Sequence, residues 1–474
     1  MKVLYNTGDV VVINAIIANN DLMWEKAPAD GSYIPEDWMD IVWSNEETNR
    51  RITELHLYYH YSLSGVLDVS GLTGLKRLNC NSNQLNALNI SGLTELETLE
   101  CDSNQLTTLD LSALTKLKKL YCGSNLLTTL DLSAQTQLEE LWCLCNQLTV
   151  LCVSSSTILK ILHCNDNKLT ELDVSALTEL ERLYCSGNQL SILDVSSSTK
   201  LNFIQCCENR LTALEMSGLT ELDFLTCDNN QLTALNVSSL TNLDCFLCSN
   251  NQLITLDVSA LAKLRSLSCH HNRLTYLNVS ALSKLDRLCC HNNQLTVLDV
   301  TGLSKLRLLA CASNQLTELD VSDLSKLRYL ECDDNQLTVL DLSMFGRNLK
   351  FFDGADQHPA LSLKGNDDLW QETVDFGADG NVVFSENKAF TYVDKTLSSN
   401  DNTKNKTDFT VKTGFEGKVL SGTMMVTYNK KYYFIGDGVE VSYRDNQLTV
   451  IDVPAGMTML EELNCEGNKL INDD

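Results

Sequence analysis

The hydrophobic and polar positions of this chain repeat every 21 residues. The recurring positions of one unit are Leu99, Cys101, Asn104, Leu106, Leu109, Leu111, Leu114 and Leu117. Cysteine fills its position in thirteen successive units, from Cys80 to Cys332, and an asparagine stands three residues after each one. Leu99 and Cys101 alternate with outward-facing residues, which is the period-two pattern of a short β-strand. The pattern therefore predicts one strand per unit, with a turn at the asparagine.

A 21-residue period lies in the range of leucine-rich repeats and predicts a solenoid. The expected fold is an α/β-type solenoid, a leucine-rich-repeat horseshoe with 21-residue coils and a parallel concave sheet. Asn104 and its equivalents are expected to bond backbone groups of their own coil and the neighbouring coil. Ser112 and its equivalents suit the N-cap of a short helical turn on the convex side. Asp110 recurs less strictly, which favours a structural hydrogen-bonding role over an ion site.

The two ends of the chain depart from the repeat. Residues 1–51 contain an apolar-periodic stretch from Val10 to Ile17 that predicts a helix, and an open solenoid needs such an N-terminal cap. The solenoid with its cysteine ladder is expected over residues 52–360. Residues 361–438 lose leucine and gain alternating β-branched and aromatic residues, which predicts a small β-rich module. The repeat pattern returns over residues 439–474.

The cysteines are interpreted as reduced and structural. Parallel strands about 4.8 Å apart would give each ladder thiol two equivalent neighbours, so no ladder cysteine has a unique disulfide partner. A thiol in such a place packs as a small apolar group. Nineteen reduced cysteines would fit a reducing cytosol or an anaerobic exterior better than an oxidising secretory route.

Charge narrows the range of partners. The chain has 36 basic and 62 acidic residues, a net charge of −26, which is expected to repel nucleic acid and anionic lipid. No apolar run is long enough to span a membrane, so no membrane insertion is expected. The first residues, Met1 to Asp9, lack the apolar stretch of an export signal.

The repeats resemble those of a known family. Coils written Leu-x-Cys-x-x-Asn-Gln-Leu-Thr-x-Leu-Asp-Val-Ser look like those of the internalin J group of bacterial cysteine-ladder leucine-rich-repeat surface proteins. The likeness covers roughly residues 52 to 353. It implies adhesion or host-ligand binding through the concave face, and an extracellular or cell-surface location. No export signal or wall anchor is visible, which leaves a cytoplasmic location open.

Aromatic residues gather on the predicted strand face. Counting from each ladder cysteine, the preceding residue and the residue three before it should point to solvent. These columns contain Tyr121, Trp142, His163, Tyr184, Phe203 and Phe224 in six consecutive coils. They predict an oblique stripe about 25 Å long at strand spacing. Two interpretations stay open: contact with a protein or carbohydrate ligand, or stacking that stabilises the solenoid.

A second cluster contains histidines. His270 and His291 share the column after the cysteine in adjacent coils, with His271 and Cys289 beside them, and zinc accepts such ligands. Inert surface histidines are the alternative. No catalytic motif occurs, so the leading hypothesis is a non-enzymatic recognition or adhesion protein without a cofactor. A metalloprotein or enzyme centred on the histidines and an architectural spacer are the competing classes.

Overall fold

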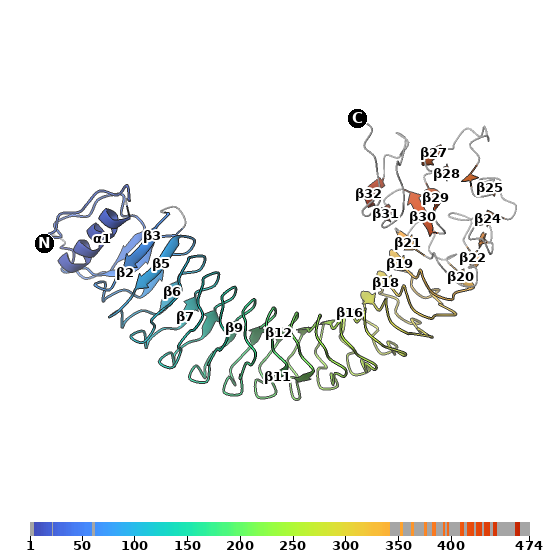
Figure 1. Cartoon of the computed structure of the whole chain (residues 1–474), viewed down its shortest axis with the longest axis horizontal. Helices are drawn as coiled ribbons and strands as arrows, with labels where there is room; N and C mark the ends of the chain where they lie inside the picture. The colour runs from blue at the N-terminus through green and yellow to red at the C-terminus, as the bar shows by residue number, and fades with distance from the viewer. Residues whose placement is uncertain are drawn as a thin grey trace. The chain divides into compact units, whose positions relative to one another are not determined.

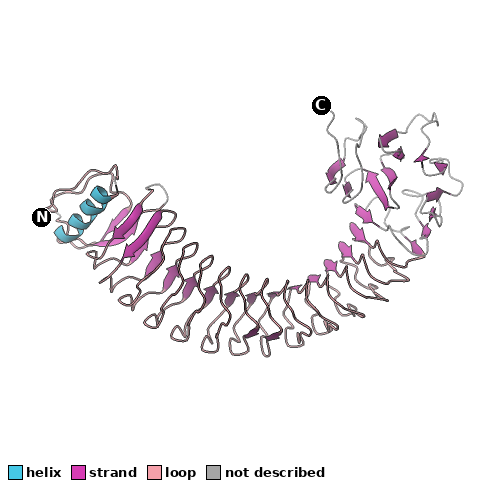
Figure 2. Ribbon diagram, viewed as in Figure 1, coloured by secondary structure: helices cyan, strands magenta, loops and turns pink. Residues whose placement is uncertain are grey.

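A computed structural model describes residues 4–20, 22–58 and 62–341, together with short strands in the C-terminal region. The chain divides into two compact units, residues 1–240 and 241–474. Figure 1 labels some of the elements of each unit, and Figure 2 shows that strands and loops, with a single helix, make up the described residues. None of the described residues form a helix with the length and apolar character needed to span a bilayer.

The first unit begins with a cap. Helix α1 (Thr7–Asn19) starts after Asn6, whose side-chain oxygen accepts a hydrogen bond from the Asp9 N–H at 3.0 Å. Its residues Val10, Ile13, Ile16 and Ile17 are buried, and strand β1 (Ile41–Trp43) pairs antiparallel with strand β2 (Ile52–His56). The helix expected over Val10 to Ile17 is therefore confirmed.

An ion pair between a half-buried arginine and a buried aspartate joins the cap to the first coil. The Asp9 side chain is fully buried in α1, and its Oδ1 lies 2.9 Å from Nη2 of Arg51. The Ile52 N–H donates to Oδ2 of the same carboxylate at 2.8 Å. A buried carboxylate is tolerated when a cation and other donors satisfy it, so these contacts join α1 to the start of β2.

The coils of the first unit build a continuous sheet. After β1, all neighbouring strands in this sheet are parallel, and each pairs with the residues one repeat away, as Leu141 does with Leu162. The strands that follow β2 are β4 (Arg77–Asn79), β6 (Thr98–Glu100), β7 (Lys119–Tyr121), β8 (Glu140–Trp142), β9 (Ile161–His163), β10 (Arg182–Tyr184), β12 (Phe203–Gln205) and β14 (Phe224–Thr226). Two small parallel pairs lie outside this sheet: β3 (Ser64–Asp68) with β5 (Gln84–Asn89), and β11 (Ile192–Asp194) with β13 (Ala213–Glu215).

The asparagine column bonds successive coils together. Nδ2 of Asn167 donates to the carbonyl oxygen of Cys143 in the preceding coil at 3.0 Å and to that of Cys164 in its own coil at 3.1 Å. Its Oδ1 accepts from the Leu148 N–H of the preceding coil at 3.0 Å. The same contacts recur along both units, for example at Asn104 and Asn314. The predicted role of this column is confirmed.

The ladder cysteines are core residues. All thirteen from Cys80 to Cys332 are fully buried among the leucines. The eighteen cysteines within the described residues are thiols and not disulfides. Burial raises the pKa of Cys80 and Cys164 to about 12, so these groups stay protonated at neutral pH.

The segment opposite the strand differs from expectation. It forms two tight turns, in which the Leu114 N–H donates to Leu111 and the Leu117 N–H to Leu114, and within the described coils it contains no helix. Leucines three residues apart stack in such turns, whereas an α-helix repeats every 3.6 residues. The expected N-cap role of Ser112 is therefore wrong. Its N–H instead donates a hydrogen bond to Asp110 Oδ1 at 3.0 Å. These bonds lower the pKa of Asp110 and confirm its structural role.

The second unit continues the same repeat. Its parallel strands are β15 (Cys245–Leu247), β16 (Ser266–Ser268), β17 (Arg287–Cys289), β18 (Leu308–Ala310), β19 (Tyr329–Glu331) and β21 (Phe351–Asp353). A mixed sheet contains β20 (Val339–Asp341), β22 (Ser362–Lys364), β23 (Val374–Phe376) and β24 (Val382–Phe384).

Antiparallel strands follow in the region predicted to be β-rich. They are the pair β25 (Tyr392–Val393) and β26 (Thr396–Leu397), and the sheet of β27 (Asp408–Val411), β28 (Phe415–Leu420), β29 (Thr423–Tyr428) and β30 (Lys431–Gly436). Parallel pairing returns in β31 (Val439–Ser442) and β32 (Leu460–Asn464), with Val439 opposite Leu460. The proposed boundaries at residues 360 and 438 stay predictions.

Candidate functional site

The six predicted aromatic residues lie on one face of the first unit's sheet. In strands β7 to β10 the middle leucine or its equivalent is buried, and the residue after it is half-buried on the opposite face. This places Tyr121, Trp142, His163 and Tyr184 in one column. In β12 and β14 the aromatic residue is two positions earlier, at Phe203 and Phe224. We call these six residues the aromatic stripe.

The rings of the aromatic stripe touch in an unbroken series. Ring centroids are 5.8 Å apart for Tyr121 and Trp142, and 5.0 Å apart for Trp142 and His163. The series changes column between Tyr184 and Phe203, whose centroids are 4.7 Å apart, because Phe203 lies opposite Arg182 and diagonal to Tyr184. It ends with Phe203 and Phe224 stacked at 4.4 Å. The structure thus brings all six residues together.

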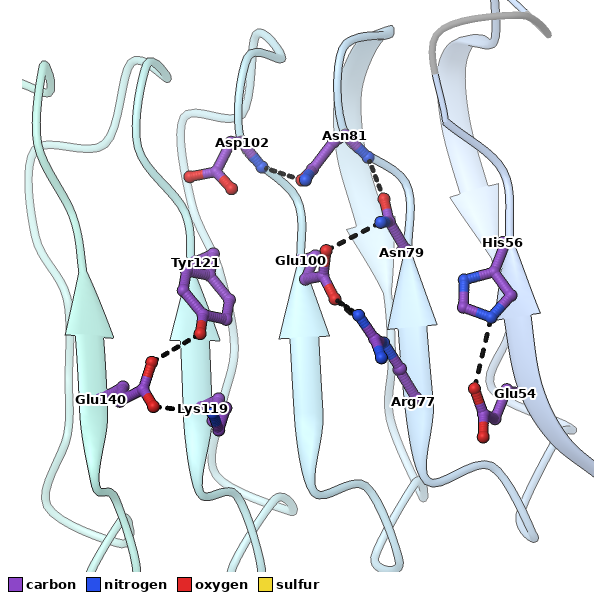
Figure 3. A network of polar contacts seen from close by, with 10 residues as sticks. All are labelled: Glu54, His56, Arg77, Asn79, Asn81, Glu100, Asp102, Lys119, Tyr121 and Glu140. Carbon is purple, nitrogen blue, oxygen red and sulfur yellow. Dashed lines mark hydrogen bonds and ion pairs between the residues drawn. The ribbon is translucent and has the colours of Figure 1, made fainter.

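Polar side chains border the Tyr121 end of the aromatic stripe. The Tyr121 hydroxyl donates to Oε2 of Glu140 at 2.6 Å, and Nζ of Lys119 donates to Oε1 of the same carboxylate at 2.6 Å (Figure 3). Burial, followed by the bond to Glu140, raises the pKa of Tyr121. Burial opposes ionisation of Glu140, but the bonds from Lys119 and Tyr121 hold its pKa below the ordinary value. Tyr121 is therefore a neutral hydrogen-bond donor whose hydroxyl is bonded to Glu140.

A polar network continues over the neighbouring coils. Arg77 and Asn79 both donate to the Glu100 carboxylate, at 2.6 Å and 2.7 Å (Figure 3). Asp102 Oδ1 accepts from the Gly123 N–H at 2.6 Å. Burial raises the pKa of Asp102 to about 6. This carboxylate changes charge close to neutral pH, beside the start of the aromatic stripe.

Two buried nitrogen atoms of the aromatic stripe lack a protein partner. They are the indole Nε1 of Trp142 and Nδ1 of His163. Burial lowers the pKa of His163, so its imidazole is neutral at pH 7. The centre of the aromatic stripe is therefore uncharged and contains an indole donor without an acceptor, a feature that buried polar groups in proteins rarely show.

The histidine cluster lies in the second unit, after strands β16 and β17. The ligand nitrogens of His270, His271 and His291 all lie within 4.8 Å of one another. The His270 and His291 rings are stacked with centroids 4.3 Å apart, and His271 meets both edge-on. Burial and then the two neighbouring imidazoles lower the pKa of His291 to about 4. The predicted neighbours are brought together, whereas Cys289 is not among these clustered ligand atoms.

Sequence reasoning missed two features of these surfaces. The first is Glu140, which stands two residues before Trp142 on the same strand; this spacing already placed it on the same face. The second is a basic surface in the second unit, where side chains line two depressions of about 540 and 530 Å³. Its basic residues are Arg265, Lys284, Arg287, Lys305, Arg307, Lys326 and Arg328, and its carboxylates are Asp244, Asp286 and Glu331. Net charge alone therefore does not describe this region, and the exclusion of nucleic acid stays a prediction.

Comparison with known proteins places the chain in a family. No family profile and no curated protein sequence matches it. Among solved structures, the functional domain of InlJ from Listeria monocytogenes, which includes a cysteine ladder, is 32% identical and matches 82% of this chain and 87% of that one, with a TM-score of 0.62. A leucine-rich-repeat protein of Leptospira interrogans is 29% identical over 63% and 82% of the two chains, with a TM-score of 0.57.

A further internalin has the same fold. InlF of Listeria monocytogenes is 25% identical and matches 69% of this chain and 90% of that one, with a TM-score of 0.50. Leucine-rich-repeat solenoids serve as scaffolds for protein interactions, and their stacked strands form the extended binding surface. With its uninterrupted cysteine and asparagine columns, the chain belongs to the cysteine-ladder leucine-rich-repeat internalins.

Proposed function

We propose that the aromatic stripe binds a protein or glycan ligand and that the protein acts in recognition or adhesion without catalysis. The observation that carries this proposal is the unbroken contact of six half-buried rings on the strand face. Contiguous aromatic surface of this kind is a typical binding surface, because covering it with a ligand removes apolar area from water.

Stacking for stability alone explains the aromatic stripe less well. A phenylalanine at position 142 could also stack on the neighbouring rings, and it would bury no N–H group that lacks an acceptor. A buried donor without a partner costs about 1–3 kcal/mol, so Trp142 is a poor choice for a purely structural ring. A ligand that carries hydroxyl or carbonyl oxygens would supply the missing acceptor after a small shift of the neighbouring rings.

The surroundings suit a ligand with both apolar and polar groups. The rings offer flat apolar faces, and the Lys119–Glu140 pair at one end offers polar atoms that are already ordered. Sugar rings and protein side chains both combine these features. Membership of the internalin family supports an extracellular or cell-surface location for this recognition.

The test is a binding measurement after a glycan and protein array screen. In the variant Trp142→Gln with Tyr184→Gln, glutamine replaces both rings, because Gln205 already occupies the same column in the coil that follows Tyr184. Loss of a central aromatic contact typically costs about 2 kcal/mol, so each replacement should weaken binding about thirtyfold. Tyr276→Ala is the matched control, because Tyr276 is 62% exposed and lies outside the aromatic stripe.

The melting temperature separates the two explanations. If the rings bind a ligand, the double variant should melt close to the parent, since its core of leucine and cysteine is intact. Undiminished binding by the double variant would refute the proposal. A large fall in melting temperature would assign the rings to stabilisation of the coils.

A further inference from the structure

The histidine cluster has the arrangement of a three-ligand metal site. His270 and His291 occupy the same column in adjacent coils, and His271 is the residue after His270. One ligand nitrogen from each lies within 4.8 Å of the other two. A tetrahedral site with metal–nitrogen bonds of about 2.0–2.1 Å needs its nitrogens a little over 3 Å apart, so side-chain rotation has to bring these nitrogens closer together.

The backbone around the cluster is held in place by the solenoid. The His271 N–H donates to the His291 carbonyl oxygen at 3.1 Å, and the Asn250 N–H donates to the His270 carbonyl oxygen at 3.0 Å. Ladder asparagines also donate to these two carbonyl oxygens. Nδ2 of Asn272 lies 3.2 Å from the carbonyl oxygen of His270, and Nδ2 of Asn293 lies 3.3 Å from the carbonyl oxygen of His291. The three side chains therefore start from a fixed frame, which reduces the entropy lost when a ligand orders them.

His271 has a left-handed backbone conformation. Its φ is +51°, in the left-handed region shared by the second residue after every ladder cysteine, from Ser82 to Asp334. The neighbouring coils place Asn250 and Asn292 at this position, both well suited to positive φ. In this coil a histidine takes the strained position, and its ring meets both other imidazoles edge-on.

We propose that His270, His271 and His291 bind one divalent transition-metal cation of the zinc class, with a fourth position open to water or to a ligand atom. Imidazole nitrogen is a preferred donor for zinc, cobalt, nickel and copper, and three histidines with an open position form an established zinc geometry. The site lies in the second unit and is independent of the aromatic stripe.

A further observation points to a bound ligand. Nδ1 of His291 is buried and has no hydrogen-bond partner in the protein. Buried polar atoms nearly always have a partner, and a bound ion is one of the partners that such an exception indicates. The stacked rings of His270 and His291 are nearly parallel, at 9°, so their lone pairs do not yet converge. Binding therefore requires rotation of at least one ring, without movement of the pinned backbone.

The chain itself suggests conservative variants. His270→Ser, His271→Asn and His291→Ala introduce the residues that Ser249, Asn250 and Ala312 provide in the same columns of neighbouring coils. Each replacement is thus already compatible with this backbone, and the melting temperature checks that each variant folds. His56→Ala is the matched control, because His56 belongs to the first unit and contacts Glu54.

The experiment titrates the reduced, full-length chain with cobalt(II) chloride, followed by absorption, and with zinc chloride, followed by calorimetry. We expect one tight equivalent of cation per chain and a cobalt spectrum without thiolate charge-transfer bands. Each histidine variant should weaken binding by more than about tenfold, since loss of even an outer-shell contact costs that much, and His56→Ala should bind as the parent does.

Three results would overturn the proposal. They are the absence of a tight equivalent, equal uptake by the triple histidine variant, and a cobalt spectrum dominated by thiolate ligands. The last result would assign binding to cysteines, of which Cys145 and Cys152 are exposed.

Discussion

Replacement of one ladder asparagine should greatly lower the urea concentration at which the coils around it unfold. We consider Asn167→Ala, at the centre of the first unit. The Asn167 side chain makes four hydrogen bonds: it accepts from Leu148 N–H at 3.0 Å and donates to the carbonyl oxygens of Cys143, Cys164 and Asn165 at 3.0, 3.1 and 3.1 Å. Alanine removes all four and leaves the Leu148 N–H buried without an acceptor.

The magnitude follows from these contacts. An unsatisfied buried N–H costs about 1–3 kcal/mol, and each neutral hydrogen bond contributes about 0.5–1.5 kcal/mol net. The three donated bonds share two N–H groups, so they count as two at most. The expected loss is therefore roughly 3 kcal/mol in the free energy of unfolding, before any cost of the small cavity.

Urea unfolding followed by circular dichroism measures this loss, and hydrogen exchange locates it. Because each coil contacts only its neighbours, exchange should accelerate most at the Leu148 N–H and less in distant coils. Thr149→Ala is the control, since Thr149 is exposed in the neighbouring coil. A loss below about 1 kcal/mol, or one no larger than that of the control, would show that the asparagine column does not hold the coils together.

Two further predictions concern the cysteines. Cys185 is fully buried in the ladder, so Cys185→Ser should lower the free energy of unfolding by about 1–3 kcal/mol. Cys185→Ala should lower it by less, because a hydroxyl is costlier to bury than a methyl group. Equal losses for the two variants in urea unfolding would contradict this. In the native protein, iodoacetamide at pH 7 should modify Cys152 before Cys145, as measured by peptide mass spectrometry. Both are exposed, but bonds from the Ser154 side chain and backbone lower the pKa of Cys152, whereas burial and then Asp166 raise that of Cys145. The thiolate is the reactive form, so as the pH is raised Cys152 should reach its full labelling rate at a lower pH than Cys145, and the reverse order of labelling would be the contrary result.

The columns of the aromatic stripe could be read from the sequence, but its contacts could not. A 21-residue offset indicates which residues neighbour each other, so Tyr121 and Trp142 were expected side by side. The diagonal contact of Tyr184 with Phe203 depends on strand register and ring rotamers. Likewise, the bond of Tyr121 to Glu140 depends on how far two flexible side chains reach across adjacent strands. Periodicity does not specify such rotamers.

The pattern of residues along the chain was enough to predict the solenoid, its register, the buried cysteine and asparagine columns and the capping helix. This was possible because in a repeat array each coil contacts its neighbours, so distance along the chain converts directly into position in space. The folded structure was needed to show that the segment opposite the strand forms turns, that Cys289 stays outside the cluster of His270, His271 and His291, and that Asp9 is buried against Arg51. These features depend on local backbone dihedral angles and on packing between segments outside the repeat. A period of 21 residues specifies neither the dihedral angles nor that packing.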